Sequence, residues 1–447
     1  MARTHGLNGT PVLVAGAGLA GLAAARSLEA RGAAVTIVDA RDRVGGRVWT
    51  VRDGFAARQH AEAGADLIEE DQDHVRTLAR DLGLRPVRIL RRGFGYYGPD
   101  ARGRRRVHGR PAAFASLAAR LHREIEEFTL AEERWDGAVA ARLARRSVGE
   151  WLDEVDAPTA LRAAVRAFRG FFLADPEDLS ILPVVEQFAC GGMPGRSAML
   201  RIPGGNDRLA TLAAARLHAP VRLMTIVRRL TQDASGVRAI VESDGRTAEI
   251  RASFAVSALP ASTARDVIFD PPLPDAQHDA IATLPYGRAT RLLVQFDRRF
   301  WRGRARPIAY ATDLDIGAIW DGNEQQRGRA GILSFLAGGR ASAGLQALMR
   351  GGGSDAVARQ LAWLGTPPRV LTSRVIVWDD DPWVRGGYAY FGPAFDPLGR
   401  AWLARPAGRI VFAGEHTSVR WQGYMNGAVE SGLRAAAEVA ALAGSAG

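Results

Sequence analysis

The chain begins with a short apolar run, residues 12–14, and a second apolar run follows at residues 35–38. Short continuous apolar runs are typical of strands that are buried on both faces of a parallel sheet. The segment between the two runs is rich in alanine and leucine, as expected of a buried helix. We therefore predict a strand, a helix and a second, parallel strand at the start of the chain.

Helical spacing dominates the next part of the chain. Apolar residues recur every three or four positions in 75–82 and 114–128, which predicts a helix in each. Ser147 and Glu150 have the spacing of a capping box, so another helix is predicted to begin there. We interpret the whole block 67–196 as mostly helical.

Strand patterns return in the second half of the chain. Two runs that flank Ser243-Asp244-Gly245 predict a hairpin, because these residue types favour tight turns. Three successive glycines, residues 351–353, predict a flexible loop. The predicted strands are 221–230, 237–242, 247–251, 254–259, 292–296, 332–335 and 410–412.

A glycine motif joins the first predicted strand to the first helix, in the order Gly16-Ala17-Gly18-Leu19-Ala20-Gly21. Gly16 allows a tight turn, Gly18 lets the backbone approach a pyrophosphate, and Gly21 lets the helix pack against the strand. The N-terminus of the helix offers N–H groups and the positive end of its dipole to phosphates. The motif predicts a dinucleotide site.

Asp39 directly follows the second predicted strand, where an acid would bind the ribose hydroxyls of a dinucleotide. The alternative is a solvated aspartate that merely ends a buried strand. An acid at this place favours an unphosphorylated ribose, as in FAD or NAD, over NADP.

Composition narrows the class of protein. The 447 residues suffice for about two or three domains, and 47% hydrophobic and 24% charged residues are ordinary for a globular protein. The net charge is +11 and all 59 basic residues are arginines. Nucleic-acid or membrane binding is one interpretation of this charge. The densest basic patch, 102–106, lies in a glycine-containing loop without interleaved aromatic residues, so we favour a solvated loop.

The single cysteine, Cys190, leaves no disulfide framework and no thiolate metal cluster, and we predict no metal site. The N-terminal residues lack an apolar signal core, and no apolar run is long enough to span a membrane. These features predict a cytoplasmic protein without a membrane or nucleic-acid partner.

The residues after Asp39 separate FAD from NAD. They run Ala40-Arg41-Asp42-Arg43-Val44-Gly45-Gly46-Arg47, which resembles the extended nucleotide signature of the flavin amine oxidase family. This family comprises monoamine oxidases, polyamine oxidases and L-amino acid oxidases. The resemblance implies that the second glycine pair and Arg47 line the flavin side of FAD.

The C-terminal part carries the second half of the resemblance. A strand that runs into Gly414-Glu415 and the segment Gly423-Tyr424-Met425 before the last helix match the family. The resemblance places Glu415 at the ribityl chain, the start of the last helix at the N1–C2=O edge of the flavin, and the backbone of Val227 at the adenine. The residues expected to bind FAD are Gly16, Gly18, Leu19, Ala20, Gly21, Asp39, Ala40, Arg41, Gly45, Gly46, Arg47, Gly64, Ala65, Val227, Trp378, Gly414, Glu415, Gly423, Tyr424, Met425 and Ala428.

The segment from Trp378 to Tyr388 resembles the monoamine oxidase segment that passes beside the flavin. Gly387 stands where animal monoamine oxidases carry the cysteine that bonds the flavin, so we expect non-covalent FAD. By the same resemblance, Tyr388 and Tyr424 face each other across the substrate, where an aromatic pair can orient an amine and exclude water. The alternative is two core tyrosines.

The chain departs from the family at Arg291, where the family usually has a lysine that reaches flavin N5 through a water. Arginine is planar and permanently charged, which puts oxygen as the electron acceptor in question. A second departure follows Gly64, where Ala65, Asp66 and Leu67 stand in place of the arginine that binds the substrate carboxylate in amino acid oxidases.

The resemblance covers nearly the whole chain and implies an α/β two-domain flavoprotein. A Rossmann-like FAD-binding domain (1–66, 197–268 and 372–447) is interleaved with an α+β substrate domain (67–196 and 269–371). We expect a FAD-dependent amine oxidase that releases hydrogen peroxide, with Tyr388, Tyr424 and Arg291 at the reacting centre. An L-amino acid oxidase, a flavin dehydrogenase or desaturase with another acceptor, and a non-catalytic flavin scaffold are the alternatives; a homodimer is left open.

Overall fold

A parallel sheet forms the centre of one half of the molecule in the computed structural model, which describes residues 6–108, 111–189, 198–303 and 307–445. Its strands follow the order β2-β1-β13-β20 and are parallel throughout. The bounds are β1 Pro11–Ala15, β2 Ala34–Val38, β13 Phe254–Ser257 and β20 Ile410–Phe412. The predicted strand–helix–strand at the start of the chain is confirmed.

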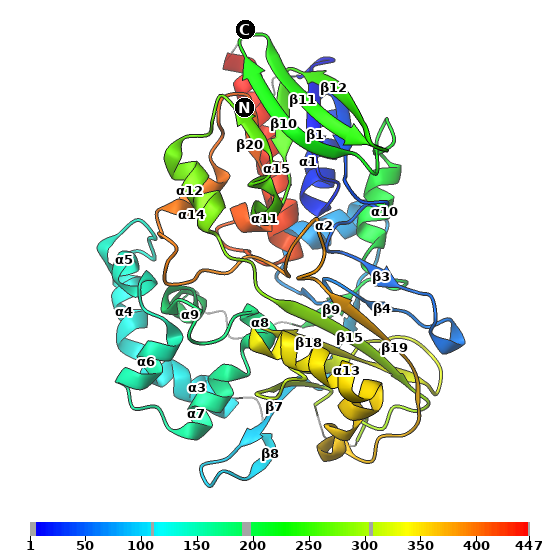
Figure 1. Ribbon diagram of the computed structural model, residues 1–447, viewed down its shortest axis with the longest axis vertical. Helices are drawn as coiled ribbons and strands as arrows, with labels where there is room; N and C mark the ends of the chain where they lie inside the picture. The colour runs from blue at the N-terminus through cyan, green and yellow to red at the C-terminus, as the bar shows by residue number, and fades with distance from the viewer. Residues whose placement is uncertain (1–5, 109–110, 190–197, 304–306, 446–447) are drawn as a thin grey trace.

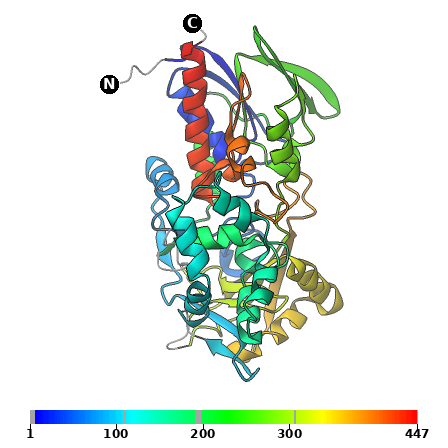
Figure 2. The same cartoon turned by 90° about the vertical axis from the view of Figure 1, so that its left-hand side faces the viewer.

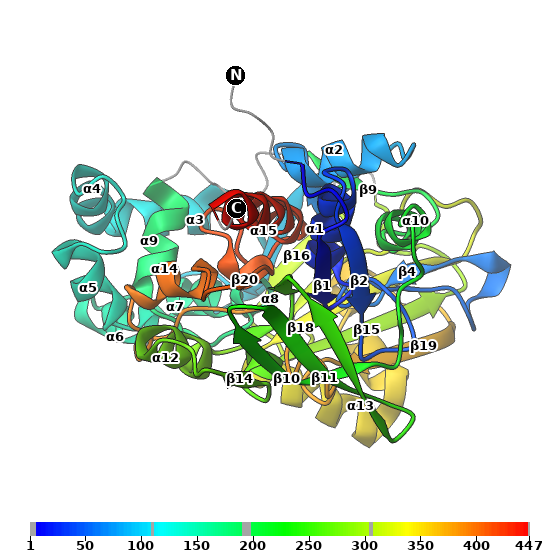
Figure 3. The same ribbon diagram turned by 90° about the horizontal axis from the view of Figure 1, so that it is seen from above.

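Two helices, α1 (Leu19–Glu29) and α15 (Met425–Ser445), run side by side over one face of this sheet (Figure 3). A four-stranded sheet, with three antiparallel strands and one strand parallel to its neighbour, covers the other face, so the central sheet is buried on both sides, as its apolar runs predict. The covering strands are β10 Ile226–Asp233, β11 Gly236–Ser243, β12 Arg246–Ala252 and β14 Ile268–Asp270. Helices α10 (Arg208–Ala215), α11 (Ala261–Ala264), α12 (Asp275–Thr283) and α14 (Gly399–Ala404) flank this half.

A seven-stranded sheet forms the other half, in the order β19-β15-β18-β17-β16-β7-β8 (Figure 1). Helix α13 (Arg340–Arg359) packs against it, and β15 is buried along its whole length. The strands are β7 Phe94–Pro99, β8 Arg105–His108, β15 Ala289–Phe296, β16 Ala309–Thr312, β17 Ala318–Asp321, β18 Gly331–Gly338 and β19 Val370–Val377.

A group of helices lies beside the second sheet (Figure 2) and buries Phe128 and Trp151 in a core of its own. The predicted capping box is confirmed, because the Glu150 N–H donates to Ser147 Oγ at 3.0 Å and the Ser147 N–H donates to the Glu150 carboxylate at 2.8 Å. The helices are α3 Pro111–Arg120, α4 His122–Leu130, α5 Ala138–Ala144, α6 Val148–Glu154, α7 Thr159–Arg166, α8 Arg169–Phe172 and α9 Ile181–Ala189.

Short strands connect the two halves. The pair β3 (Thr50–Val51) and β4 (Ala61–Glu62) and the set β5 (Ile68–Glu69), β9 (Met199–Arg201) and β6 (Val87–Ile89) lie between the glycine motif and the second sheet. Helix α2 (Asp73–Asp81) follows β5 and docks on α15 through the Val75 N–H, which donates to Asn426 Oδ1 at 3.0 Å. These connections bring the 61–69 segment under the seven-stranded sheet.

Four sequence expectations are corrected. The helix predicted at 114–128 is two helices that break at Leu121, where the backbone leaves the helical region. The glycines at 351–353 lie inside α13, but Gly352 (φ −163°) and Gly353 (φ +58°) have non-helical backbone angles, so the helix is broken there without a separate loop. The strand predicted at 221–230 begins only at Ile226. The block 67–196 also contains β5 to β8, since short alternating runs there pair with distant strands.

Cys190 and the expected boundary at 196–197 lie outside the described residues. Among the helices of the described ranges, none combines the length and the apolarity that a membrane span requires.

Candidate active site

The glycine motif forms a tight turn that leaves space next to one backbone position. Gly16 adopts φ +102°, and a Cβ added to Gly21 would lie 1.8 Å from the Gly16 carbonyl oxygen. A Cβ on Gly18, by contrast, would meet no atom within 4 Å. Gly18 is also the N-cap of α1, and no side chain caps this helix. Leu19 and Ala20 complete its buried first turn. This open backbone at a helix N-terminus fits a pyrophosphate.

Asp39 lies at the end of β2 and holds the glycine turn. Its carboxylate accepts the Ala17 N–H at 2.6 Å and the Arg41 N–H at 2.8 Å. Burial raises the pKa of Asp39, although the two N–H groups act in the opposite direction. The Asp39 carbonyl accepts the Thr225 N–H at 2.8 Å, which places the segment before β10, and hence Val227, beside the end of β2. The expected ribose and adenine residues thus lie on neighbouring segments, with Ala40 between Asp39 and Arg41.

The second glycine pair lies directly on the first motif. The Gly45 N–H donates to the Ala17 carbonyl at 2.8 Å, and Gly45 bridges to Gly18. Gly45 and Gly46 have φ of +97° and +56°, a region that favours glycine. Two motifs that the sequence separates by about two dozen residues therefore make one loop structure.

Arg47 joins this loop to the C-terminal motif. Its guanidinium donates to the Glu415 carboxylate and to the Gly387 carbonyl, both at 2.8 Å. Burial lowers the pKa of Arg47, but the charges of Glu415 and Tyr286 outweigh burial and hold the pKa above its ordinary value. The other oxygen of Glu415 accepts the Gly423 N–H at 2.8 Å. One buried carboxylate thus fixes two expected flavin segments.

The start of the last helix, α15, adjoins the segment that carries the Glu415 carboxylate. Gly414, which precedes Glu415, has φ +135° and donates its N–H to Ser431 Oγ of α15 at 3.0 Å. Met425 is the buried first residue of α15, and the Ala428 N–H closes its first turn on the Tyr424 carbonyl at 3.2 Å. The expected C-terminal residues are therefore contiguous in space with Glu415.

Gly64 and Trp378 lie on the side of Arg47 that faces the second sheet. A Cβ on Gly64 would meet the Arg47 carbonyl at 1.8 Å and Trp378 Cζ2 at 3.2 Å. The Ala65 N–H donates to the same Arg47 carbonyl at 3.0 Å, and Trp378 Nε1 donates to Ala63 O at 3.1 Å. The guanidinium of Arg41 pairs through both nitrogens with Asp381, three residues after Trp378, at 2.7 Å.

The two expected aromatic residues meet at Phe171, which the sequence did not single out. The Tyr388 hydroxyl donates to the Phe171 carbonyl. The Tyr424 ring contacts the Phe171 ring edge-on, with ring centres 6.4 Å apart. In the described part of the chain, Tyr388 and Tyr424 are not stacked on each other; Gly423 lies on the Tyr388 ring instead. Burial raises the pKa of both tyrosines, so both hydroxyls stay neutral near neutral pH.

Arg291 is buried beside this aromatic group. Its guanidinium donates to Gly64 O at 2.7 Å and to Ser334 Oγ at 3.0 Å, and it lies 4.7 Å from the centre of the Trp320 ring. Burial lowers the pKa of Arg291, and the charge of Asp66 acts in the opposite direction. Arg291, the third expected reacting residue, is therefore hydrogen-bonded to Gly64 and lies in the neighbourhood of Tyr388.

A buried cluster below Arg291 was not predicted. Asp66 pairs with Arg201 at 2.6 Å, and Glu62 accepts from Thr50 Oγ1 at 2.7 Å and from the Asn206 N–H at 3.0 Å. Burial, and then the charge of Asp66, raise the pKa of Glu62 to about 8. Nothing in the sequence indicates which carboxylates the side chains around Arg201 and Asn206 meet.

The fold and the site are those of a two-domain flavoprotein whose nucleotide loop, C-terminal motif and aromatic residues adjoin. A family model described as flavin containing amine oxidoreductase matches residues 19–440, and the chain belongs to this family of flavin-dependent enzymes.

Relatives of known name agree with this assignment. The chain is 32% identical over 455 residues to a putative flavin-containing monoamine oxidase, AofH, of Mycobacterium tuberculosis, and the match covers 96% of each chain. It is 27% identical to the flavin-containing amine oxidase B of Canis lupus familiaris, over 96% of this chain and 85% of the relative. Among solved structures, a cyclohexylamine oxidase from Brevibacterium oxydans superposes with a TM-score of 0.85 at 25% identity, over 97% of this chain and 99% of that chain.

Proposed function

We propose that the flavin is FAD, held without a covalent bond. Three neighbouring features support this proposal. The open backbone at Gly18 would bind the pyrophosphate, the Asp39 carboxylate the ribose, and the Val227 segment the adenine. Gly387 has no sulfur to bond the flavin, and a Cβ there would lie 2.3 Å from Leu173 Cδ1. The residues proposed to hold the isoalloxazine side are Gly45, Gly46, Arg47, Gly64, Ala65, Trp378, Gly414, Glu415, Gly423, Tyr424, Met425 and Ala428.

The proposed reaction is the oxidation of an amine. The substrate loses two electrons and two protons, one proton from carbon and one from nitrogen, and a C=N bond forms. Water then adds to the C=N bond and releases an aldehyde or ketone together with ammonia or the smaller amine. Oxygen takes the two electrons and two protons and leaves as hydrogen peroxide. When bound, the flavin supplies the two-electron acceptor that links these half-reactions.

The chain's own residues would bind and orient the amine. Tyr388 and Tyr424 both contact Phe171, and their aromatic surfaces would restrict the substrate to a neutral, largely apolar shape and exclude water. Arg47 and the start of α15 place positive charge on the side of Glu415, where negative charge develops on electron transfer. No hydroxyl or carboxylate in this arrangement is required as a nucleophile.

One observation carries the proposal: the aromatic residues come from the very segments that hold the nucleotide side. Gly423 donates its N–H to Glu415 and packs on the ring of Tyr388, while Tyr424 is the next residue. A substrate at these rings is therefore next to the flavin residues. Amino acid oxidases carry an arginine that binds the substrate carboxylate just after the position of Gly64. This chain has Ala65 and Asp66 there, and Asp66 is paired with Arg201. The departure supports an amine over an L-amino acid as the substrate.

The assignment of the chain segments follows the same proposal. Segments 1–66, 197–268 and 372–447 bind FAD, and segments 67–196 and 269–371 bind the amine. The protein acts in the cytoplasm on a small-molecule amine with oxygen, without nucleic acid; a homodimer remains the proposed assembly to be checked.

Arg291 supports a second candidate, a dehydrogenase that passes electrons to an acceptor other than oxygen. The buried guanidinium replaces a shorter, more mobile ammonium group next to Gly64. A planar cation fixed by two hydrogen bonds leaves less room for a water molecule at this place.

The test is anaerobic mixing of the FAD-loaded protein with a panel of cyclic, aromatic and linear amines, followed by admission of air. Loss of the oxidised-flavin absorbance with an amine, and its return together with hydrogen peroxide, is the expected result. Loss without return in air would replace the oxidase by the dehydrogenase. Absence of any change with amines, but reduction by an L-amino acid, would overturn the amine assignment.

A further inference from the structure

Arg291, Ser334 and Trp320 lie on one face of three adjacent strands. Trp320 of β17 is paired with Ser334 of β18, and Arg291 of β15 is paired with Leu336, two residues further along β18. Residues two apart on a strand share a face, so the three side chains project to the same side of the sheet. The hydrogen bond from Arg291 to Ser334 Oγ joins the first two directly.

The Trp320 ring supports the guanidinium of Arg291. The guanidinium carbon lies 4.7 Å from the ring centre, and the two residues are 4% and 5% exposed. A cation over the face of an indole is attracted by the ring, and more strongly when both are removed from water. Trp320 is thus a large, buried side chain against which the planar cation rests.

Trp320 is itself held in place by a charged hydrogen bond. Its Nε1–H donates to Asp66 Oδ2 at 2.6 Å, while Asp66 Oδ1 accepts from Arg201 Nε at 2.6 Å. Arg201 also donates to Gln325 Oε1 at 2.9 Å, in the loop between β17 and β18. Asp66 follows Gly64, whose carbonyl binds Arg291, so a single short segment holds both the ring and the cation.

The two buried arginines of this cluster, Arg201 and Arg291, differ in whether a carboxylate is bonded to them. Arg201 is paired directly with Asp66, whereas among the described residues the Arg291 guanidinium donates to a carbonyl and a hydroxyl. The Arg291 side chain therefore keeps a positive charge that no bonded carboxylate cancels. In a buried place such a charge acts on its neighbours more strongly than in water.

We propose that Trp320, anchored by Asp66, is a positioning residue that holds the Arg291 cation beside the flavin, where its charge makes the flavin easier to reduce. This inference rests on the proposed function, because it requires the flavin to lie against Gly64. Trp320 itself touches Arg291 and not the reacting atoms.

The test measures the reduction potential of the bound flavin by titration against a reference dye, a readout that needs no amine. In Trp320→Leu the support for the cation is lost, and we expect the equilibrium constant for reduction to fall about tenfold, which is about 30 mV for a two-electron couple. Trp320→Phe keeps a ring but loses the hydrogen bond to Asp66, so a smaller fall, about threefold, is expected.

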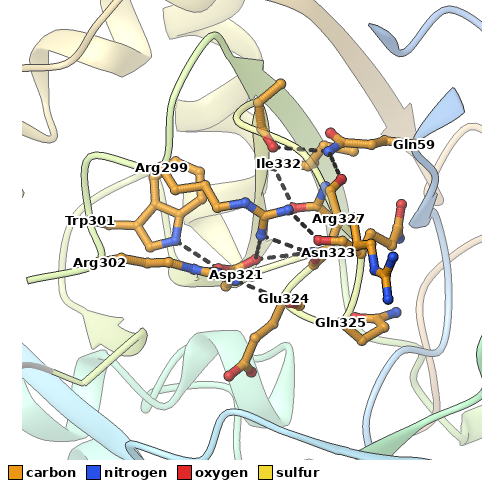
Figure 4. A network of polar contacts seen from close by, with 12 residues as sticks. Gln59, Arg299, Trp301, Arg302, Asp321, Asn323, Glu324, Gln325, Arg327 and Ile332 are labelled. Carbon is orange, nitrogen blue, oxygen red and sulfur yellow. Dashed lines mark hydrogen bonds and ion pairs between the residues drawn. The ribbon is translucent and has the colours of Figure 1, made fainter. Parts of the chain in front are cut away.

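Trp301 provides a matched control. Its Nε1–H donates to the buried carboxylate of Asp321 at 3.0 Å, the same type of bond at a site that Arg299 and Arg302 also contact (Figure 4). It is 2% exposed and belongs to the second sheet's core, where its ring contacts Phe296 and Phe300. Trp301→Phe should therefore leave the flavin potential at the wild-type value, whatever its effect on stability.

A double variant separates positioning from general damage. If Trp320 acts through Arg291, Trp320→Leu should lower the potential in the wild type and have almost no effect in an Arg291→Met background. Equal effects in both backgrounds, or no effect in the wild type, would overturn the inference. If Trp320→Leu does not bind flavin, the same comparison is made with Trp320→Phe. A wild-type protein that takes up FAD but is not reduced by amines would overturn the proposed function and leave this result standing.

Discussion

The Arg47 guanidinium lies 2.8 Å from the Glu415 carboxylate, although 368 residues separate the two in the chain. Arg47 belongs to the second glycine motif and Glu415 to the turn before the last helix. Their side chains are 22% and 6% exposed, so the pair is largely removed from water. This contact closes the nucleotide site, because each partner also binds a further segment: Arg47 binds Gly387 and Glu415 binds Gly423.

Glu415→Ala should therefore lower the free energy of unfolding by about 3 kcal/mol, since it leaves a buried arginine unpaired. Denaturant unfolding of the flavin-free protein measures this loss. The control is Asp266→Asn, which breaks the pair with Arg385 where both side chains are 47% exposed. It should change the same quantity by less than about 0.5 kcal/mol. Similar losses in the two variants would contradict the structural role of Glu415.

Gly18→Ala should remove FAD binding without unfolding the protein. A Cβ at Gly18 meets no protein atom, but it would occupy the space next to the backbone that we assign to the pyrophosphate. Flavin titration followed by fluorescence should show at least a tenfold loss of affinity, about 1.4 kcal/mol. The comparison is Gly21→Ala, whose Cβ would lie 1.8 Å from Gly16 O and should destabilise the fold itself. Normal FAD affinity in Gly18→Ala would disprove the assignment.

Acid precipitation of the wild-type protein should release all flavin into the supernatant, because Gly387 offers no bonding atom. Gly387→Ala should destabilise the protein by about 1–3 kcal/mol, since the new Cβ would lie 2.3 Å from Leu173 Cδ1. Adding Leu173→Ala should recover part of that loss. Gly351→Ala, at an exposed helical position where a Cβ meets nothing within 4 Å, is the control and should cause no loss of stability. Flavin that stays with the precipitate would contradict non-covalent binding.

Glu62 should make stability fall as pH rises. Its pKa is about 8 in the folded protein and near 4.5 when unfolded, so between these values the folded state retains a proton that the unfolded state releases. The unfolded state then binds fewer protons, and the free energy of unfolding decreases with pH across this window. Denaturant unfolding at pH 5, 6.5 and 8 should give a flatter profile for Glu62→Gln than for the wild type. The exposed Glu249→Gln should follow the wild-type slope; an unchanged slope in Glu62→Gln would refute the prediction.

Local patterns were enough to predict the nucleotide half. The apolar run before Gly16, the acid after the second strand and the Ser147–Glu150 capping box each depend on neighbours within a few residues. The helix break at Leu121 was missed, because tertiary packing overrides local propensity there. The glycine run at 351–353 does break α13, at Gly352 and Gly353, but it forms no separate loop.

The site was predictable only where a motif marks it. Tyr388, Tyr424 and Arg291 could be named from their segments, but Phe171 and Trp320 lie in stretches without a motif. Their roles come from contacts with residues more than 250 positions away, Phe171 with Tyr424 and Trp320 with Asp66. The sequence shows that buried charged residues exist, and only the fold shows which pair with which.

The strand order β2-β1-β13-β20 has a consequence for synthesis of the protein. The central strand β1 emerges first from the ribosome, but its neighbour β13 is made about 240 residues later and β20 follows after another 150 or so. Strands that pair across such distances form slowly, and until then the apolar β1 and α1 remain exposed. The N-terminal third should therefore depend on protection from aggregation while the chain is completed, and neither half can be expressed as a simple contiguous fragment.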